Sequence, residues 1–136
     1  SAAITEPVMT PNVNWLPLHC DSGRFAEFSG ADVYFVHSYH MCHFRQPELV
    51  AGTVNYGSQQ LCAIVDQGAV IGFQFHPEIT PETLNLFLEN EEELDHFPGQ
   101  HVQTQQQLKK TSKNNFIVGN QILNQAIEYV LQKTAC

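Results

Sequence analysis

The chain has 136 residues, of which 43% are hydrophobic and 15% are charged, a composition that excludes an intrinsically disordered protein. Six Lys and Arg against fourteen Asp and Glu give a net charge of −8, and the sequence holds no cluster of four basic residues. We therefore expect neither nucleic acid nor an anionic membrane as a partner. No apolar run is long enough to cross a membrane, and we expect no signal peptide.

Five stretches have the composition of β-strands, and turn residues separate them. The apolar run from Val33 to Val36 predicts a strand that is buried on both faces. Gln67 and Gly68 predict a tight hairpin, because Gly supplies the positive φ that such a turn needs. A single helical turn is expected at residues 24–28. The predicted strands cover residues 13–18, 32–39, 49–56, 61–66 and 69–75.

Two helices are predicted in the second half of the chain. Thr80 is a good N-cap and Pro81 suits the first helical position, so residues 80–90 are expected to be helical. Apolar residues recur at helical spacing over residues 116–132 and predict an amphipathic helix. The polar, Gln-rich stretch between them, residues 101–113, could be a solvated helix or a connection.

The fold class that these elements predict is α/β, with a mixed, largely antiparallel sheet of four or five strands and flanking helices. We expect a single domain over residues 1–136. In this prediction residues 1–10 are a loose arm, and residues 11–90 hold the sheet and the first helix. Residues 91–136 form an acidic connection and the C-terminal helix.

A histidine and a carboxylate follow the fifth predicted strand. In an extended chain, residues two apart point to the same side, so His76 and Glu78 can face one site, with Pro77 stiffening the link. A carboxylate beside an imidazole fixes the tautomer of the ring, as a base that serves a nucleophile requires. The alternative is a solvated His and Glu at a strand end.

The four cysteines, Cys20, Cys42, Cys62 and Cys136, are scattered and show no Cys-x-x-Cys spacing. We interpret them as reduced thiols of a cytoplasmic protein rather than as a disulfide framework. Cys62 lies inside an apolar predicted strand, which favours a small buried side chain over a nucleophile.

A second group of polar side chains, His37, His40, Cys42 and His43, lies close together in the sequence and could form a zinc site. These residues are divided between a strand and a loop, and no second ligand pair at standard spacing follows them. We therefore expect no metal site and no cofactor.

The stretch from Gly72 to Glu78 closely resembles the His-Pro-Glu signature of class I glutamine amidotransferases, whose triad is Cys-His-Glu. Other motifs resemble, in order, those of the glutaminase subunit of imidazole glycerol phosphate synthase. The resemblance covers residues 11–90, although Asn14 stands where the family has Gly. The tail after Glu91 is not part of that subunit's pattern, and Thr80-Pro81-Glu82 with a further C-terminal helix is more similar to stand-alone amidotransferases of the GMP-synthase-like type. The further matching motifs are Pro11 to Trp15, Tyr34 to Tyr39, and Asn55 to Gly57.

This resemblance implies the fold of the C-terminal half of an amidotransferase domain and assigns roles to matching residues. His76 corresponds to the general base, and Glu78 to the carboxylate that orients it. Ser38 and Tyr39 correspond to a segment whose backbone helps to hold glutamine. The implied reaction is glutamine hydrolysis through a glutamyl thioester, with ammonia passed to a synthase partner.

The family nucleophile lies in a Gly-x-Cys-x-Gly elbow, and none of the four cysteines has that setting. We therefore expect a truncated amidotransferase-like protein that lacks its nucleophile, is not catalytic alone and acts as an interaction module. The alternative is half of a split or larger amidotransferase that supplies His and Glu to a Cys-containing partner chain. A third hypothesis is different chemistry, based on Cys42 or on a His-bound metal.

Association with other chains follows from the apolar strands. A half-domain leaves strands such as residues 33–36 with an exposed edge or face. Burial between two copies predicts a homodimer, the commonest closed assembly. A glutaminase or synthase partner chain is the other predicted partner.

Overall fold

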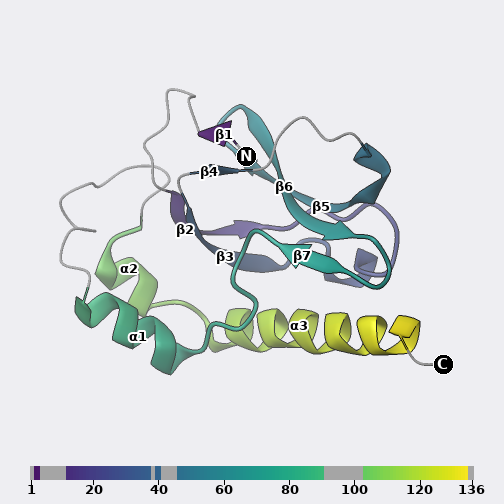
Figure 1. Ribbon diagram of the computed structural model, residues 1–136. Helices are drawn as coiled ribbons and strands as arrows, with labels where there is room; N and C mark the ends of the chain where they lie inside the picture. The colour runs from purple at the N-terminus through teal and green to yellow at the C-terminus, as the bar shows by residue number, and fades with distance from the viewer. Residues whose placement is uncertain (1, 4–11, 38, 41–45, 91–102, 135–136) are drawn as a thin grey trace.

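The computed structural model describes residues 2–3, 12–37, 39–40, 46–90 and 103–134, and these residues form antiparallel sheets with helices beside them (Figure 1). The predicted α/β class is confirmed. The strands are β1 (Ala2–Ala3), β2 (Asn12–Pro17), β3 (Asp32–His37), β4 (Tyr39–His40), β5 (Val50–Tyr56), β6 (Gln59–Asp66) and β7 (Ile71–Phe73). The helices are α1 (Pro81–Asn90), α2 (Gln105–Lys109) and α3 (Lys113–Thr134), with 3₁₀ turns at Ala26–Phe28 and Pro47–Leu49.

The strands form sheets of two, two and three strands, in the orders β1-β4, β2-β3 and β5-β6-β7, rather than the one sheet expected. Between β2 and β5 lies an isolated bridge, in which His19 and Thr53 exchange backbone hydrogen bonds of 2.8 and 2.9 Å. The register of β5 shifts at Gly52, beside this bridge. A Cβ at Gly52 would lie 3.0 Å from Cys20 Sγ and 3.1 Å from Leu18 Cδ1, so a larger residue there would have to displace these side chains.

The β2–β3 ribbon separates two clusters of buried side chains. Val33 and Phe35 pack into the first cluster, whereas Tyr34 packs into the second, as strand alternation requires. Burial on both faces of the apolar run in β3 is therefore confirmed. The first cluster also holds buried residues of β5, β6 and α3, and the second holds residues of α1, α2 and the start of α3.

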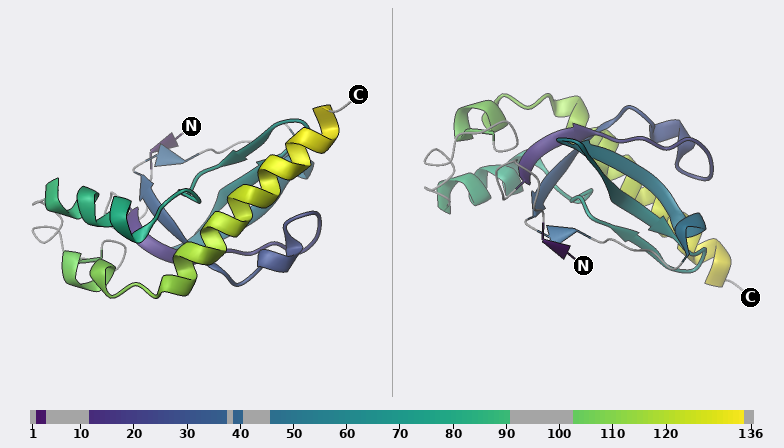
Figure 2. Two further views of the ribbon diagram at one scale, coloured as in Figure 1. Left: turned by 90° about the horizontal axis from the view of Figure 1, so that it is seen from below. Right: turned by 90° about the horizontal axis from the view of Figure 1, so that it is seen from above.

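The helices lie along one face and at one end of the sheets. Figure 1 and Figure 2 show α3 running along one face of the sheets, while α1 and α2 lie together at one end. The predicted start of α1 is confirmed, because Thr83 N donates to Thr80 Oγ1 at 3.2 Å and Thr80 N donates to Thr83 Oγ1 at 2.9 Å. None of the helices in the described ranges has the length and apolarity that crossing a membrane demands.

The fifth predicted strand is shorter than expected at both ends. Gln67 N donates to Val70 O at 2.9 Å, and Gly68 has a φ of +89°, so a four-residue turn occupies the first part of the predicted strand. Strand β7 begins only at Ile71, and it ends at Phe73. The prediction of a strand through residue 75 is therefore wrong, and the hydrogen bonds of the loop that follows Phe73 explain why.

Candidate active site

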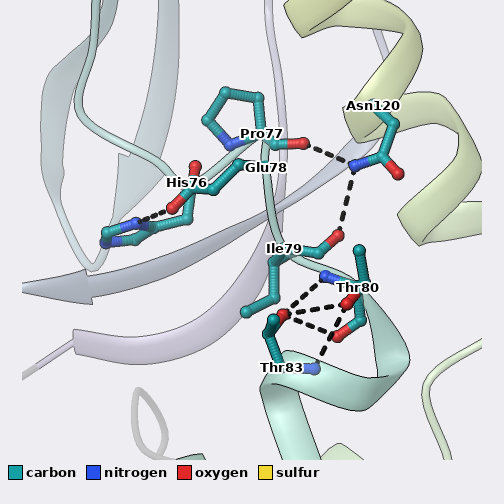
Figure 3. Close-up of polar contacts among 7 residues, drawn as sticks. All are labelled: His76, Pro77, Glu78, Ile79, Thr80, Thr83 and Asn120. Atoms are coloured by element: carbon teal, nitrogen blue, oxygen red, sulfur yellow. Dashed lines mark hydrogen bonds and ion pairs between the residues drawn. The ribbon is translucent and has the colours of Figure 1, made fainter.

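The loop that carries His76 and Glu78 follows β7 and brings the two side chains together (Figure 3). His76 Nδ1 lies 2.8 Å from Glu78 Oε1. The two side chains are 46% and 59% exposed, so the pair is open to solvent and to a ligand. The alternative that the sequence left open, in which each side chain is solvated separately, is not what the structure shows.

Two backbone hydrogen bonds to different sheets place this loop. Gln74 N donates to Ala63 O of β6 at 2.9 Å, whereas His76 N donates to Tyr34 O of β3, also at 2.9 Å. The chain thus passes from the three-stranded sheet to the β2–β3 ribbon, which ends β7 early. Phe75, between these two bonds, is only 3% exposed and anchors the passage in the first core cluster.

The far side of the loop is held by α3. Asn120 Nδ2 donates to Pro77 O at 2.8 Å and to Ile79 O at 3.2 Å. No sequence motif singles out Asn120. Its signal was a polar residue within the apolar face of α3, next to Gly119, where a Cβ would lie 3.5 Å from Pro77 O. That signal marks close contact between the helix and another part of the chain, but does not say which part.

The geometry of the pair defines what the ring can do. An ionised carboxylate only accepts hydrogen bonds, so Nδ1 donates to Glu78 and the neutral ring carries its lone pair on Nε2. Within the described part of the chain, Nε2 has no hydrogen-bond partner. Nε2 is therefore the ring nitrogen that is left to accept a proton.

The other predicted site residues are not brought to this loop by any described contact. Ser38 lies outside the described residues. Tyr39 lies in β4 and pairs with Ala3 of β1, and its side chain is not described. Cys42 and His43 also lie outside the described residues. The zinc hypothesis thus rests on side chains beyond those described, and the described residues hold no group of three that could bind a metal.

The two thiols that the structure describes are buried. Cys20 is 4% and Cys62 is 8% exposed. Burial raises the pKa of each thiol to about 11, and the neighbouring Asp21 adds to the rise at Cys20. The interpretation of Cys62 as a small buried side chain is confirmed. A thiol with so high a pKa is a poor nucleophile near neutral pH.

Comparison with known proteins gives the context of this geometry. The family model for class I glutamine amidotransferases matches residues 13–94, more than half of the chain. The match includes His76, Glu78 and α1, whereas α2 and α3 lie outside it.

Three relatives, each named imidazole glycerol phosphate synthase subunit HisH, illustrate the similarity. The protein from Methanopyrus kandleri is 38% identical over 77 residues, which cover 56% of this chain and 38% of the relative. The protein from Gloeobacter violaceus is 36% identical over 91 residues, or 63% of this chain and 40% of the relative. The protein from Synechocystis sp. is 44% identical over 79 residues, or 54% and 37%. The chain spans about two fifths of the length of these relatives.

Proposed function

This chain belongs to the class I glutamine amidotransferase family, and from that premise we propose that it supplies the base and the orienting carboxylate of a glutaminase site. The thiol of that site comes from a Gly-x-Cys-x-Gly segment that these 136 residues do not contain. The observation that carries the proposal is the 2.8 Å contact between His76 Nδ1 and Glu78 Oε1. It gives the ring the orientation that a base needs before any thiol is present.

The proposed chemistry uses both sides of the imidazole. Glu78 holds the proton on Nδ1, and Nε2 of His76 takes the proton of the thiol. The thiolate then attacks the side-chain carbonyl carbon of glutamine, and ammonia leaves with the proton that His76 returns. Water, activated by the same Nε2, hydrolyses the glutamyl thioester to glutamate and frees the thiol. Ser38 and Tyr39 stay predicted contributors to glutamine binding.

The 136 residues alone are proposed to be inactive. Both described thiols are buried and have a raised pKa, so neither can replace the missing nucleophile at neutral pH. Cys42 and Cys136 lack the flanking glycines that shape the elbow and its oxyanion hole. In this proposal the chain acts only when it binds the segment that carries the thiol, and in that sense it is an interaction module.

The proposed partners follow from the same premise. The relatives are named as subunits of a synthase, so we propose that ammonia formed at this site is passed to a synthase partner. The homodimer expected from the sequence stays a prediction. Val70, Ile127 and Leu131 are exposed apolar side chains that could contribute to such an interface. Light scattering that finds a 15.3 kDa particle at micromolar concentration would contradict the homodimer.

The test is ammonia release from glutamine by the chain alone and by the chain joined to the Gly-x-Cys-x-Gly segment of a family member. We expect no release by the chain alone and release by the fusion. His76→Ala should slow the fusion by roughly 10²–10⁴-fold, the usual contribution of a general base. The matched control is His19→Ala, because His19 is another exposed histidine.

Two results would overturn the proposal. The first is a fusion whose ammonia release does not depend on His76. The second is ammonia release by the chain alone that is abolished by Cys42→Ser, which would mean that Cys42 is the nucleophile.

A further inference from the structure

Helix α3 lies outside the residues that the family model matches, yet it contacts the loop of the proposed site. Figure 2 shows that α3 crosses one face of the sheets along most of its length. Its contact with the loop is made near its first third, at Gly119 and Asn120. This contact either only packs the helix against the loop or also sets the relative position of the His76 and Glu78 side chains.

The Asn120 amide holds the backbone on both sides of Glu78. Its Nδ2 carries two N–H groups, and these serve Pro77 O at 2.8 Å and Ile79 O at 3.2 Å. Pro77 and Ile79 are the immediate neighbours of Glu78 in the chain. The bond to Pro77 O fixes the peptide plane that leads into Glu78, and the bond to Ile79 O holds the chain at the peptide that follows Ile79.

His76 is held by a different element. Its backbone N–H donates to Tyr34 O of β3, so His76 is tied to the ribbon while Glu78 is tied to α3. In Figure 3 the His76 ring and the Asn120 amide lie on opposite sides of the Pro77–Ile79 backbone. Asn120 thus touches neither side chain of the pair, and its influence runs through the backbone alone.

We infer that Asn120 is a positioning residue, which keeps Glu78 within hydrogen-bond reach of His76 Nδ1 and so makes α3 a part of the site. The inference rests on the proposed function for its catalytic meaning. Without the amide, the two carbonyls would lose their donors, and the turn that holds Glu78 would lose its tie to α3 and keep the long 3.4 Å hydrogen bond from Ile79 N to His76 O.

The test measures the His76 ring directly, by long-range ¹H–¹⁵N NMR of the 136-residue chain at about pH 8.5, where an ordinary imidazole is neutral. The variant is Asn120→Asp, which keeps the shape but replaces the donors with oxygens that repel both carbonyls. We expect the ratio of Nδ1-protonated to Nε2-protonated rings to fall about fivefold, as the loss of one hydrogen bond implies. Asn124→Asp is the matched control, because it adds the same charge at an exposed position of α3.

The ring signal separates positioning from packing. Both roles predict a lower melting temperature for Asn120→Asp, but only positioning predicts a lower ratio of Nδ1-protonated to Nε2-protonated rings. Asn120→Gln keeps an amide and should restore part of that ratio. A folded Asn120→Asp variant with the wild-type ring spectrum would overturn the inference. If that variant does not fold, Asn120→Ala removes the donors without adding charge. A wild-type ring spectrum in Asn120→Ala would likewise overturn the inference.

The ring measurement needs no glutaminase activity, so its outcome is independent of the proposed function. A fusion that releases no ammonia would count against the proposed function and leave the ring measurement valid. In an active fusion, Asn120→Asp should lower kcat and leave KM unchanged. A raised KM with unchanged kcat would count against positioning.

Discussion

His76 and Glu78 lie in an environment opposite to that of the described thiols of this chain. The side chains of His76 and Glu78 are 46% and 59% exposed and in contact, whereas Cys20 and Cys62 are 4% and 8% exposed and have a pKa of about 11. The chain thus presents a paired histidine and carboxylate to solvent and keeps both of these thiols protonated in its core. In the proposed function, the thiol that His76 serves is therefore neither Cys20 nor Cys62.

The cause of the difference is the position of each group relative to the sheets. Cys62 lies within β6, and Cys20 lies beside the bridge that joins β2 to β5. His76 lies where the chain leaves one sheet for the other, so its backbone is held while its side chain points out. Phe75, immediately before it, is the buried anchor of that exposed loop.

Removal of the anchor should have the largest effect. Phe75 is 3% exposed and packs against Phe35 and Phe73, with ring centroids 5.9 and 5.1 Å away. Phe75→Ala should lower the free energy of unfolding by about 3–5 kcal/mol in urea titrations. Leu86→Ala, at a 59% exposed position of α1, should change it by less than about 0.5 kcal/mol. Equal effects would contradict the burial of Phe75.

The thiols should be protected from electrophiles. A pKa of about 11 against the ordinary 9.0 lowers the thiolate fraction at neutral pH about hundredfold. We expect iodoacetamide to label Cys20 and Cys62 at least about a hundred times more slowly in the native chain than in urea. Mass spectrometry of the separate peptides distinguishes them from Cys42 and Cys136. Rapid labelling of Cys62 in the native chain would contradict its burial and its raised pKa, and with them the difference in exposure between Cys62 and His76.

The same pKa shifts predict a loss of stability at alkaline pH. The folded-state pKa of about 11 lies above the ordinary 9.0, so the folded chain holds these protons more tightly than the unfolded chain does. Stability is therefore unaffected by the thiols below pH 9 and falls as the pH rises to about 11, by roughly 1.4 kcal/mol per pH unit for each thiol. Burial also raises the pKa of Tyr34 and Tyr56, which extends the loss.

Unfolding in urea at a series of pH values measures this slope. Cys62→Ala should make the fall between pH 9 and about 11 shallower than in the wild type. An identical slope in the variant would show that Cys62 ionises as freely in the folded chain as in the unfolded one.

The smallest effect is expected where α3 meets the loop of the base. A Cβ at Gly119 would lie 3.5 Å from Pro77 O, an ordinary van der Waals distance. Gly119→Ala should therefore fit and should stabilise the chain by about 0.5–1 kcal/mol, through a better helix propensity and a less flexible unfolded state. Thermal unfolding measures the gain. A lower melting temperature would mean that the helix lies closer to Pro77 than this distance.

Local signals in the sequence account for the parts of the fold that were predicted. Thr80 and Pro81 mark the start of α1, and the apolar run of β3 indicates burial on both faces, because each signal acts within a few residues. Contacts between distant segments account for what was missed. The end of β7 depends on bonds from Gln74 and His76 to two different sheets.

The candidate site divides in the same way. The pairing of His76 with Glu78 joins residues two apart, so the sequence could suggest it. Asn120 is separated from Pro77 and Ile79 by 43 and 41 residues, and no local pattern indicates which segment its amide meets. The register shift between β5 and β6 likewise occurs at Gly52, which packs against Cys20 from a distant part of the chain.

The proposed orientation of the His76 ring by Glu78 is tested most directly by the ¹⁵N spectrum of that ring in the 136-residue chain. With the ring neutral, we predict the proton on Nδ1 in the wild type, because Glu78 Oε1 lies 2.8 Å away and accepts it. In Glu78→Ala the proton should shift toward Nε2. The same spectrum in the wild type and the variant would mean that Glu78 does not orient the ring, and would contradict the role proposed for the pair.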